Sequence, residues 1–373
     1  MNTNRTNGSK LTILTEKLLA ERKIANISAN ALAPEDFPYN IEVIAENLEI
    51  PWAVAVSGDG RIFFTERTGT VRVIDEGILL PEPVIAFGAP FISEGEGGLM
   101  GIVLDPEFRQ NHYLYVMHTY SEGGRSDNRV VRLVEQDNRA ILDRIILDRI
   151  PGGQIHNGGR IKIGPDRKLY ITTGDAGDAG LAQDLTSTAG KILRVELDGS
   201  IPADNPFANS PVFSYGHRNP QGLAWNMDNV LYASEHGATA RDEINIIRPG
   251  GNYGWPVIEG GEEAGGLITP LLNSGQVTWA PSGIAFVTEG PWQGRLLAAA
   301  LRGERLITLT LNSNGTQVEE IEEWLHNELG RLREVVRAED GSLYILTNNT
   351  DGRGNPDCTD DKLLRLIPKN LRR

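Results

Sequence analysis

The chain has 373 residues, of which 40% are hydrophobic and 23% are charged, and it contains a single cysteine. Its formal net charge of −14 argues against a nucleic-acid-binding surface, because such surfaces concentrate lysine and arginine. The lone Cys358 excludes an intramolecular disulfide and a CxxC metal or redox pair. The length suits one large β domain or two ordinary domains, so the domain count must come from the pattern.

The N-terminal segment, residues 1–37, lacks the uninterrupted apolar run of a signal peptide, and no later segment is apolar enough to cross a membrane. Its LTILTEKLLAERKI stretch could form a short amphipathic helix, but a polar stretch ending in Pro38 separates it from the first strand pattern. We expect residues 1–37 to be an extension, either a linker or the remnant of a processed leader.

An internal repeat organises the rest of the chain. Six times an apolar phrase is followed by a turn containing Gly, Asp or Asn, a strand that often contains Leu-Tyr, a polar loop and a second strand. The starts lie about 45 to 65 residues apart, which is typical of propeller blades. The six phrases begin with PWAVAV, GLMGIV, GRIKIG, PQGLAW, PSGIAF and LREVVR. The pattern predicts an all-β protein, a six-bladed β-propeller whose innermost strands surround a central channel.

Most sequence motifs of common enzyme classes are missing. The chain has no GxxxxGK[ST], HExxH or GxSxG motif. The glycine-rich GEGGLMG at 95–101 lacks the GxGxxG spacing and does not open a helix, so a nicotinamide-binding unit is not supported.

Polar side chains recur instead at the corresponding edge of successive blades. His156 stands just before Gly158 and Gly159, with only Asn157 between, where the missing side chains allow a close approach or an unusual backbone conformation. Arg331 and Arg333 alternate along a strand pattern, so both should point to one side. The full set is Glu96, His156, Arg160, Arg218, Asn219, Arg302, Arg331 and Arg333. Several arginines at a channel mouth predict a pocket for a small, multiply anionic molecule.

Longer phrases carry a resemblance to a known family. They include HNGGRIKIGPDRKLYITTGD, YGHRNPQGLAW, ASEHGATARDEINIIRPGGNYGWPV and RLREVVRAEDGSLYILTNNTDGRG, and the similarity covers residues 38–368. The chain resembles the soluble aldose sugar dehydrogenases of the glucose/sorbosone dehydrogenase family, which depend on pyrroloquinoline quinone (PQQ). The resemblance implies one catalytic propeller domain over residues 38–373, with PQQ at the channel mouth and calcium beside it. It also implies oxidation of an aldose sugar at C1 to a lactone, an external electron acceptor, and a location outside the cytoplasmic membrane.

The resemblance also implies roles for single residues. His156 matches the catalytic general base, and Arg218 with Asn219 matches the pair that contacts the quinone, where Arg218 would stabilise developing negative charge. Arg331 and Arg333 match the pair that binds the PQQ carboxylates.

Four positions depart from the glucose-oxidising members. Glu96 replaces a glutamine and Arg302 replaces a lysine, both expected at the cofactor, while Ile155 replaces an acidic residue before the histidine. Ala238 stands where proline is common, a change that a backbone ligand tolerates. These differences weaken any assignment of glucose in particular.

Calcium is implied at two places. The backbone carbonyls of Gly237 and Ala238 match the ligands of a cofactor-associated ion, and Glu243 with Tyr253 matches those of a further structural ion. The acidic loop NTDGRGNPDCTDD lacks the DxDxDG spacing, and we expect it to be a solvated turn.

Two other functions stay open at this stage. A calcium-dependent sugar lactonase would need carboxylates and amides around one axial metal. A cofactor-free interaction propeller, like the related domain of hedgehog-interacting proteins, would need no arginine cluster. Which sugar is oxidised, what accepts the electrons and whether the chain forms oligomers are also open.

Overall fold

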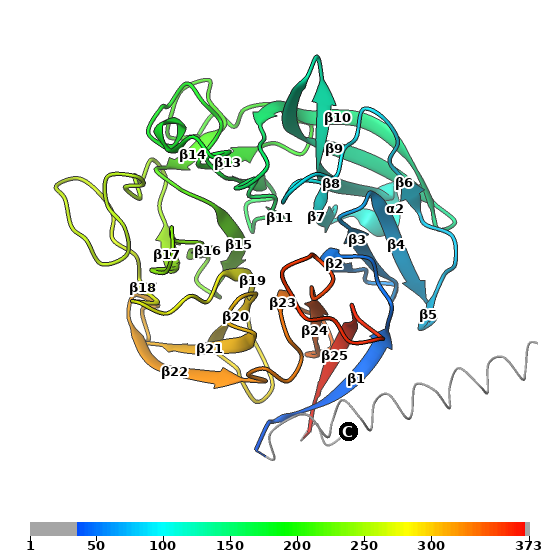
Figure 1. Cartoon of the computed structure of the whole chain (residues 1–373). Coiled ribbons are helices and arrows are strands. Elements are labelled where there is room, and N and C mark those ends of the chain that lie inside the picture. Colours follow the sequence, from blue (N-terminus) through cyan, green and yellow to red (C-terminus); the bar gives the residue numbers. More distant parts are fainter. Residues whose placement is uncertain (1–35, 370–373) are drawn as a thin grey trace, which may run out of the picture.

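The computed structural model describes residues 36–369, which form six antiparallel sheets arranged around a central axis (Figure 1). The predicted all-β, six-bladed propeller is therefore confirmed. Helical structure within the described range is confined to α2 (Phe108–Asn111) and the 3-10 turn η1 (Ala179–Ala182). No helix among these residues is long and apolar enough to span a membrane.

Blades 1 to 5 follow one another along the chain, and in each the first strand lies nearest the axis (Figure 1). Blade 1 consists of β2 (Pro51–Val56), β3 (Ile62–Glu66), β4 (Thr70–Asp75), β5 (Ile78–Leu79) and β6 (Ile85–Ala86). Blade 2 consists of β7 (Leu99–Leu104), β8 (Tyr113–Glu122), β9 (Arg125–Gln136) and β10 (Arg139–Pro151). Blade 3 consists of β11 (Ile161–Ile163), β12 (Leu169–Thr173), β13 (Lys191–Val195) and β14 (Val212–Tyr215). Blade 4 consists of β15 (Pro220–Trp225), β16 (Leu231–Glu235), β17 (Glu243–Ile247) and β18 (Leu272–Asn273). Blade 5 consists of β19 (Pro281–Phe286), β20 (Arg295–Ala300), β21 (Arg305–Leu311) and β22 (Val318–Trp324).

Blade 6 joins the two ends of the described chain. Its inner strands are β23 (Leu332–Arg337), β24 (Leu343–Thr347) and β25 (Leu363–Pro368), and its outermost strand is β1 (Tyr39–Ala45). β1 pairs antiparallel with β25, so that Tyr39 lies opposite Pro368 and Val43 opposite Leu364. The ring is thus closed by hydrogen bonds between the first strand and the last.

The core lies between neighbouring blades, where apolar side chains of facing sheets pack together. Five-residue strands such as β12 and β16 are buried along their whole length, because both of their faces meet another blade. Phe37 is 0% exposed, and its ring centroid lies 5.5 Å from that of Trp292. The packed structure therefore includes residue 37, which we had placed in the N-terminal extension. Residues 1–35 of that predicted extension lie outside the described residues.

Strand direction decides where functional side chains gather. Neighbouring strands are antiparallel, so the edge at which an innermost strand begins is also the edge at which the second strand ends. We call this edge of the ring the front mouth and the opposite edge, where the innermost strands end, the rear mouth. A six-residue strand spans about 20 Å, which sets the separation of the two mouths.

Candidate functional site

The front mouth encloses a cavity of about 400 Å³ and an adjoining deeper one of about 30 Å³. Both cavities are lined by Glu96, His236, Arg331 and Arg353, so they form one continuous site. The structure brings nearly all the site residues predicted from sequence to this place. The larger cavity is lined by Glu96, His156, Arg218, Asn219, Gly237, Ala238, Arg302 and Arg331, and the deeper one by Arg333.

His156 lies in the segment that leads into β11, and two contacts hold it. Its backbone N–H donates to Glu96 Oε2 at 2.9 Å, and its ring Nδ1 lies 2.7 Å from Asp175 Oδ1. An ionised carboxylate only accepts, so Nδ1 carries the hydrogen, and in a neutral ring the lone pair is then on Nε2. Gly158 and Gly159 have φ angles of 65° and 102°, as their predicted role in an unusual backbone conformation requires.

Asp175 is the partner of the histidine that sequence reasoning missed. It follows the end of β12 by two residues, which places it at the front mouth beside the start of β11. Asp175 also accepts hydrogen bonds from the Trp255 indole at 2.9 Å and from the Gly177 N–H at 2.8 Å. Burial would raise the pKa of Asp175, but the hydrogen bonds from His156, Gly177 and Trp255 hold it below its usual range. The carboxylate therefore stays ionised and orients the ring.

Arg218 projects into the larger cavity without an ion pair among the described residues. Its guanidinium lies 5.4 Å from the centroid of Trp255 and donates to the His236 carbonyl at 3.3 Å, and its buried Nε has no hydrogen-bond partner. Asn219 is buried, and its Oδ1 accepts the Gly158 N–H at 3.0 Å. Asn219 thus supports the glycine segment as well as lining the cavity.

Arg331 and Arg333 enter from the start of β23. Arg331 forms an ion pair of 3.0 Å with Asp351, whereas Arg333 donates only to neutral groups, the amides of Gln221 and Asn348 and the hydroxyl of Ser282. Burial lowers the pKa of Arg333 to about 9, an effect that Asp351 opposes and that Arg331 reinforces. This is the environment of a cation that lacks an anion.

The charges around the site do not balance. Six guanidinium groups line the two cavities, namely those of Arg67, Arg218, Arg302, Arg331, Arg333 and Arg353. Only three carboxylates do so, those of Glu96, Asp242 and Asp351. Burial lowers the pKa of Arg67 as well, and its buried Nε has no hydrogen-bond partner. His236 is neutral, because burial lowers its pKa to about 4. The site therefore carries an excess of three positive charges.

The loop between β24 and β25 differs from the expected solvated turn. Its Asp351 is the partner of Arg331, and its Arg353 reaches Glu96 with a distance of 2.7 Å. Burial would raise the pKa of Glu96, but hydrogen bonds from His156 and Arg353 hold it below its usual range. Asp361 is 0% exposed and accepts hydrogen bonds from Thr347 and Thr350. Only part of the loop, including Cys358, faces solvent.

Three further positions singled out from the sequence differ in where their side chains lie. Arg302, in the loop between β20 and β21, is exposed at the rim and has no hydrogen bond among the described residues. Arg160 does not reach the front cavities, contrary to its place in the predicted set: it is 1% exposed inside the ring and pairs with Glu334. Ile155 is 41% exposed, and Asp175 rather than residue 155 orients the histidine.

Three of the four residues that the resemblance implies as calcium ligands lie together beside this site, while Ala238 lines the larger cavity. A small cavity of about 10 Å³, room for a single ion or water, is lined by Gly237, Glu243 and Tyr253 together with Glu235. Burial, and then the neighbouring Glu235, raise the pKa of Glu243 to about 8. Two buried carboxyl groups that repel each other fit a cation, and oxygen donors of this kind suit calcium. No group of three or more His, Cys, Asp or Glu side chains converges on one point within residues 36–369.

Comparison with known proteins agrees with this geometry. Residues 48–365 match the family described as glucose/sorbosone dehydrogenase. The aldose sugar dehydrogenase YliI of Escherichia coli is 33% identical over 359 residues, covering 89% of this chain and 93% of that protein. Quinoprotein glucose dehydrogenase B of Acinetobacter calcoaceticus is 31% identical, covering 80% of this chain and 73% of that protein. The structure of PQQ-bound aldose sugar dehydrogenase from Streptomyces coelicolor superposes with a TM-score of 0.81 at 38% identity, covering 90% of this chain and 99% of that one.

Proposed function

The chain belongs to the glucose/sorbosone dehydrogenase family of oxidoreductases, and we propose that it oxidises aldose sugars at C1 to lactones with PQQ as cofactor. The observation that carries this proposal is the excess of three guanidinium charges beside the oriented His156–Asp175 pair. A tricarboxylate such as PQQ supplies the missing anions, and the histidine supplies a base next to them.

The arginines of the front mouth fit the cofactor. Buried Nε atoms of Arg67, Arg218 and Arg333 find no hydrogen-bond partner among residues 36–369, which leaves these donors unsatisfied there. Arg331 and Arg333, on the deeper cavity, would hold carboxylates of PQQ, with Arg302 and Arg353 nearer the rim. When bound, PQQ supplies the two-electron acceptor for the hydride that leaves the sugar C1.

His156 acts on the other product of the oxidation, the proton. Nε2 takes the proton of the C1 hydroxyl, so that loss of the C1 hydride leaves a lactone carbonyl. Asp175 then lies 2.7 Å from Nδ1 of the imidazolium and offsets its new charge. Trp255 holds the other carboxylate oxygen, which keeps the ring from turning away.

Arg218 faces the same cavity from the start of β15 and would stabilise negative charge that develops during hydride transfer. Its lack of a carboxylate partner favours this role, because an ion-paired guanidinium would already be neutralised. Asn219 would assist by keeping the Gly158 segment, and with it His156, in place.

Calcium would be held next to the cofactor by the carbonyls of Gly237 and Ala238, and a further ion by Glu243 and Tyr253. The raised pKa of Glu243 beside Glu235 supports a cation there. Gly237 lines both the larger cavity and the small one, so the two metal positions would share a wall.

The two alternatives are less well supported. A sugar lactonase would need an axial metal, but Arg160, Glu334 and Arg333 fill the interior of the ring with side chains that already pair or hydrogen-bond. A cofactor-free propeller that only binds other proteins would not need six arginines around one cavity. An external electron acceptor and a location outside the cytoplasmic membrane stay predictions by analogy.

One reconstitution experiment separates the three functions. The apoprotein is mixed with PQQ and calcium, and reduction of an artificial dye is followed with a panel of aldoses and, separately, hydrolysis of sugar lactones. We expect dye reduction that needs both PQQ and an aldose. Lactone hydrolysis that needs calcium alone would support the lactonase, and absence of both activities together with absence of PQQ binding would leave the interaction module.

A further inference from the structure

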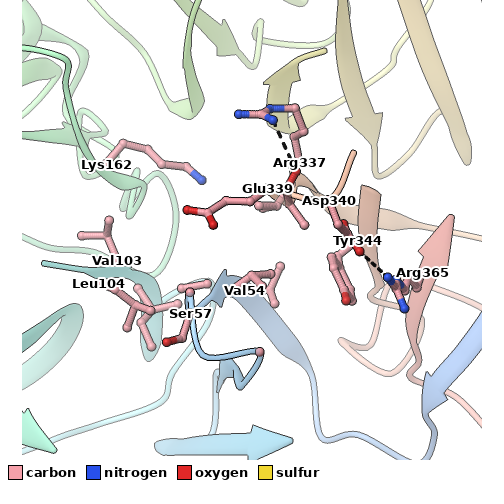
Figure 2. A pocket seen from close by; sticks show the side chains of 17 residues that line it. Val54, Ser57, Val103, Leu104, Lys162, Arg337, Glu339, Asp340, Tyr344 and Arg365 are labelled. Atoms are coloured by element: carbon pink, nitrogen blue, oxygen red, sulfur yellow. Dashed lines mark hydrogen bonds and ion pairs between the residues drawn. The ribbon is translucent and has the colours of Figure 1, made fainter. Parts of the chain in front are cut away.

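The rear mouth holds a second cavity, of about 530 Å³, within the range of small-molecule sites. It is lined by the ends of β2, β7, β11 and β23 and by the turns that follow β2 and β23 (Figure 2). The buried pair Arg160 and Glu334 belongs to the strand segments between the two mouths, and neither residue lines this cavity. The cavity is therefore separate from the sugar and cofactor site.

Lys162 extends into this cavity from β11 (Figure 2). Its backbone pairs with Tyr170, but its ammonium has no hydrogen bond or ion pair among residues 36–369. The Lys162 side chain is half-buried, and burial lowers the pKa of Lys162, an effect that Glu334 opposes. A half-buried ammonium without an acceptor is costly, and an anion in the cavity would remove that cost.

Glu339 extends toward the same space from the turn between β23 and β24 (Figure 2). Its carboxylate likewise has no hydrogen bond or ion pair in the described part of the chain, and it forms none with Lys162 Nζ. The cavity thus presents one unmatched cation and one unmatched anion.

The other charged groups of the cavity are already matched. Asp340 accepts from Ser342 and pairs with Arg365. Arg337 donates to the Ala338 carbonyl and lies 3.7 Å from Glu289. A ligand with only a negative charge would be attracted by Lys162 but repelled by Glu339. A ligand with only a positive charge would be attracted by Glu339 but repelled by Lys162. Only a ligand with both charges satisfies both groups.

Apolar side chains form the rest of the wall. Val54, Val103 and Leu104 line the cavity on the side of blades 1 and 2 (Figure 2). A ligand with a short aliphatic part would cover these groups, which gains roughly 25 cal/mol for each Å² of apolar surface removed from water.

We propose that the rear mouth binds a small zwitterion with an aliphatic body, of the class of the α-amino acids. The ligand carboxylate meets Lys162, its ammonium meets Glu339, and its side chain lies against Val54, Val103 and Leu104. Nothing in this site depends on sugar oxidation, so the proposal stands or falls independently of the proposed function.

Isothermal titration calorimetry on the full-length protein tests the proposal with matched probes. Leucine and valine carry both charges, 4-methylpentanoate carries only the carboxylate, and 3-methylbutylamine only the ammonium. We expect leucine or valine to bind and each single-charge probe to bind about tenfold more weakly, because it leaves either Lys162 or Glu339 without a partner of opposite charge. Lys162→Met should remove the advantage of leucine over the amine, and Glu339→Gln its advantage over the carboxylate. Glu319→Gln, which removes an exposed carboxylate of β22, should change neither.

Three results would overturn the proposal. They are no binding of leucine or valine, binding of leucine no tighter than that of both single-charge probes, and unchanged binding in Glu339→Gln. Glu339 is exposed on a turn, so its variant keeps the test decisive even if Lys162→Met fails to fold.

Discussion

The guanidinium of Arg353 lies 2.7 Å from the carboxylate of Glu96, although 257 positions separate the two residues along the chain. The second oxygen of the same carboxylate accepts the N–H of His156. The Glu96 carboxylate, at the entrance to blade 2, thus binds both a loop of blade 6 and the segment that carries the proposed base.

The first prediction concerns this ion pair. Arg353→Met should raise the dissociation constant for PQQ several-fold, about 1 kcal/mol, because it removes one cation from the rim of an anion site. Turnover at saturating PQQ should change little. The matched control is Arg167→Met in the turn between β11 and β12, which removes an equally exposed arginine that pairs with Glu107. Equal PQQ affinity in both variants, measured by cofactor titration, would show that Arg353 does not contribute to cofactor binding.

The second prediction concerns the proposed base. His156→Ala should keep PQQ bound and lower kcat about 10²- to 10⁴-fold, since the arginines hold the cofactor and the histidine acts on the sugar. Near-full activity across pH 6 to 9 would mean that another group is the base.

Asp175→Asn tests the residue that orients the base. It should lower kcat about tenfold to 100-fold without changing PQQ affinity. The acid limb of the pH–rate profile should move to lower pH, because the imidazolium loses an adjacent negative charge. Asp178→Asn, which removes a carboxylate charge in the same loop but keeps an oxygen that can accept the Gly180 N–H, is the control. An unmoved acid limb in Asp175→Asn would contradict the assigned role.

The fourth prediction separates two kinds of arginine. Arg331→Ala combined with Arg333→Ala should raise the PQQ dissociation constant strongly, yet much activity should return at saturating cofactor. Arg218→Ala should instead lower turnover even when PQQ is saturating, because it removes stabilisation of charge that develops during the reaction. Wild-type PQQ affinity in the double variant would rule out an anionic cofactor at the deeper cavity.

The fifth prediction concerns calcium. Chelation followed by gel filtration should release or weaken PQQ and lower Tm together, since an ion at 100 times its Kd contributes about 2.7 kcal/mol to the folded state. Glu243→Gln should make Tm less sensitive to the chelator, whereas Glu263→Gln on a neighbouring exposed turn should not. Identical melting curves with and without chelator would show that no bound metal ion stabilises this protein.

Sequence reasoning reached the ring and most of the front mouth, because both follow from local pattern. The six repeats are visible as strand and turn periods, and site residues such as Arg218 and Arg331 stand at equivalent edges of their blades. Antiparallel pairing then carries them to one side of the ring without any knowledge of distances.

What the sequence did not reveal depends on contacts between blades. Asp175 looks like one more turn residue until β12 places it beside His156. The loop at Asp351 and Arg353 has the composition of a solvated turn, yet it folds back over the channel mouth to pair with Arg331 and Glu96. Arg160 shares the periodic position of the cavity residues, but its side chain pairs with Glu334, a contact that no one-dimensional pattern contains.

The pairing of β1 with β25 sets the order of events during synthesis. A ribosome releases Tyr39–Ala45 before any other strand of the ring, but the strand that hydrogen-bonds to them, Leu363–Pro368, follows all the others. Until then the nascent chain carries an unsatisfied strand at its start and an open sixth blade, and contacts of such long sequence separation form slowly. Most blades can assemble while translation continues, whereas closure of the ring waits for β25. A chain that ends before β25 should therefore stay bound to chaperones and should not yield a smaller active enzyme.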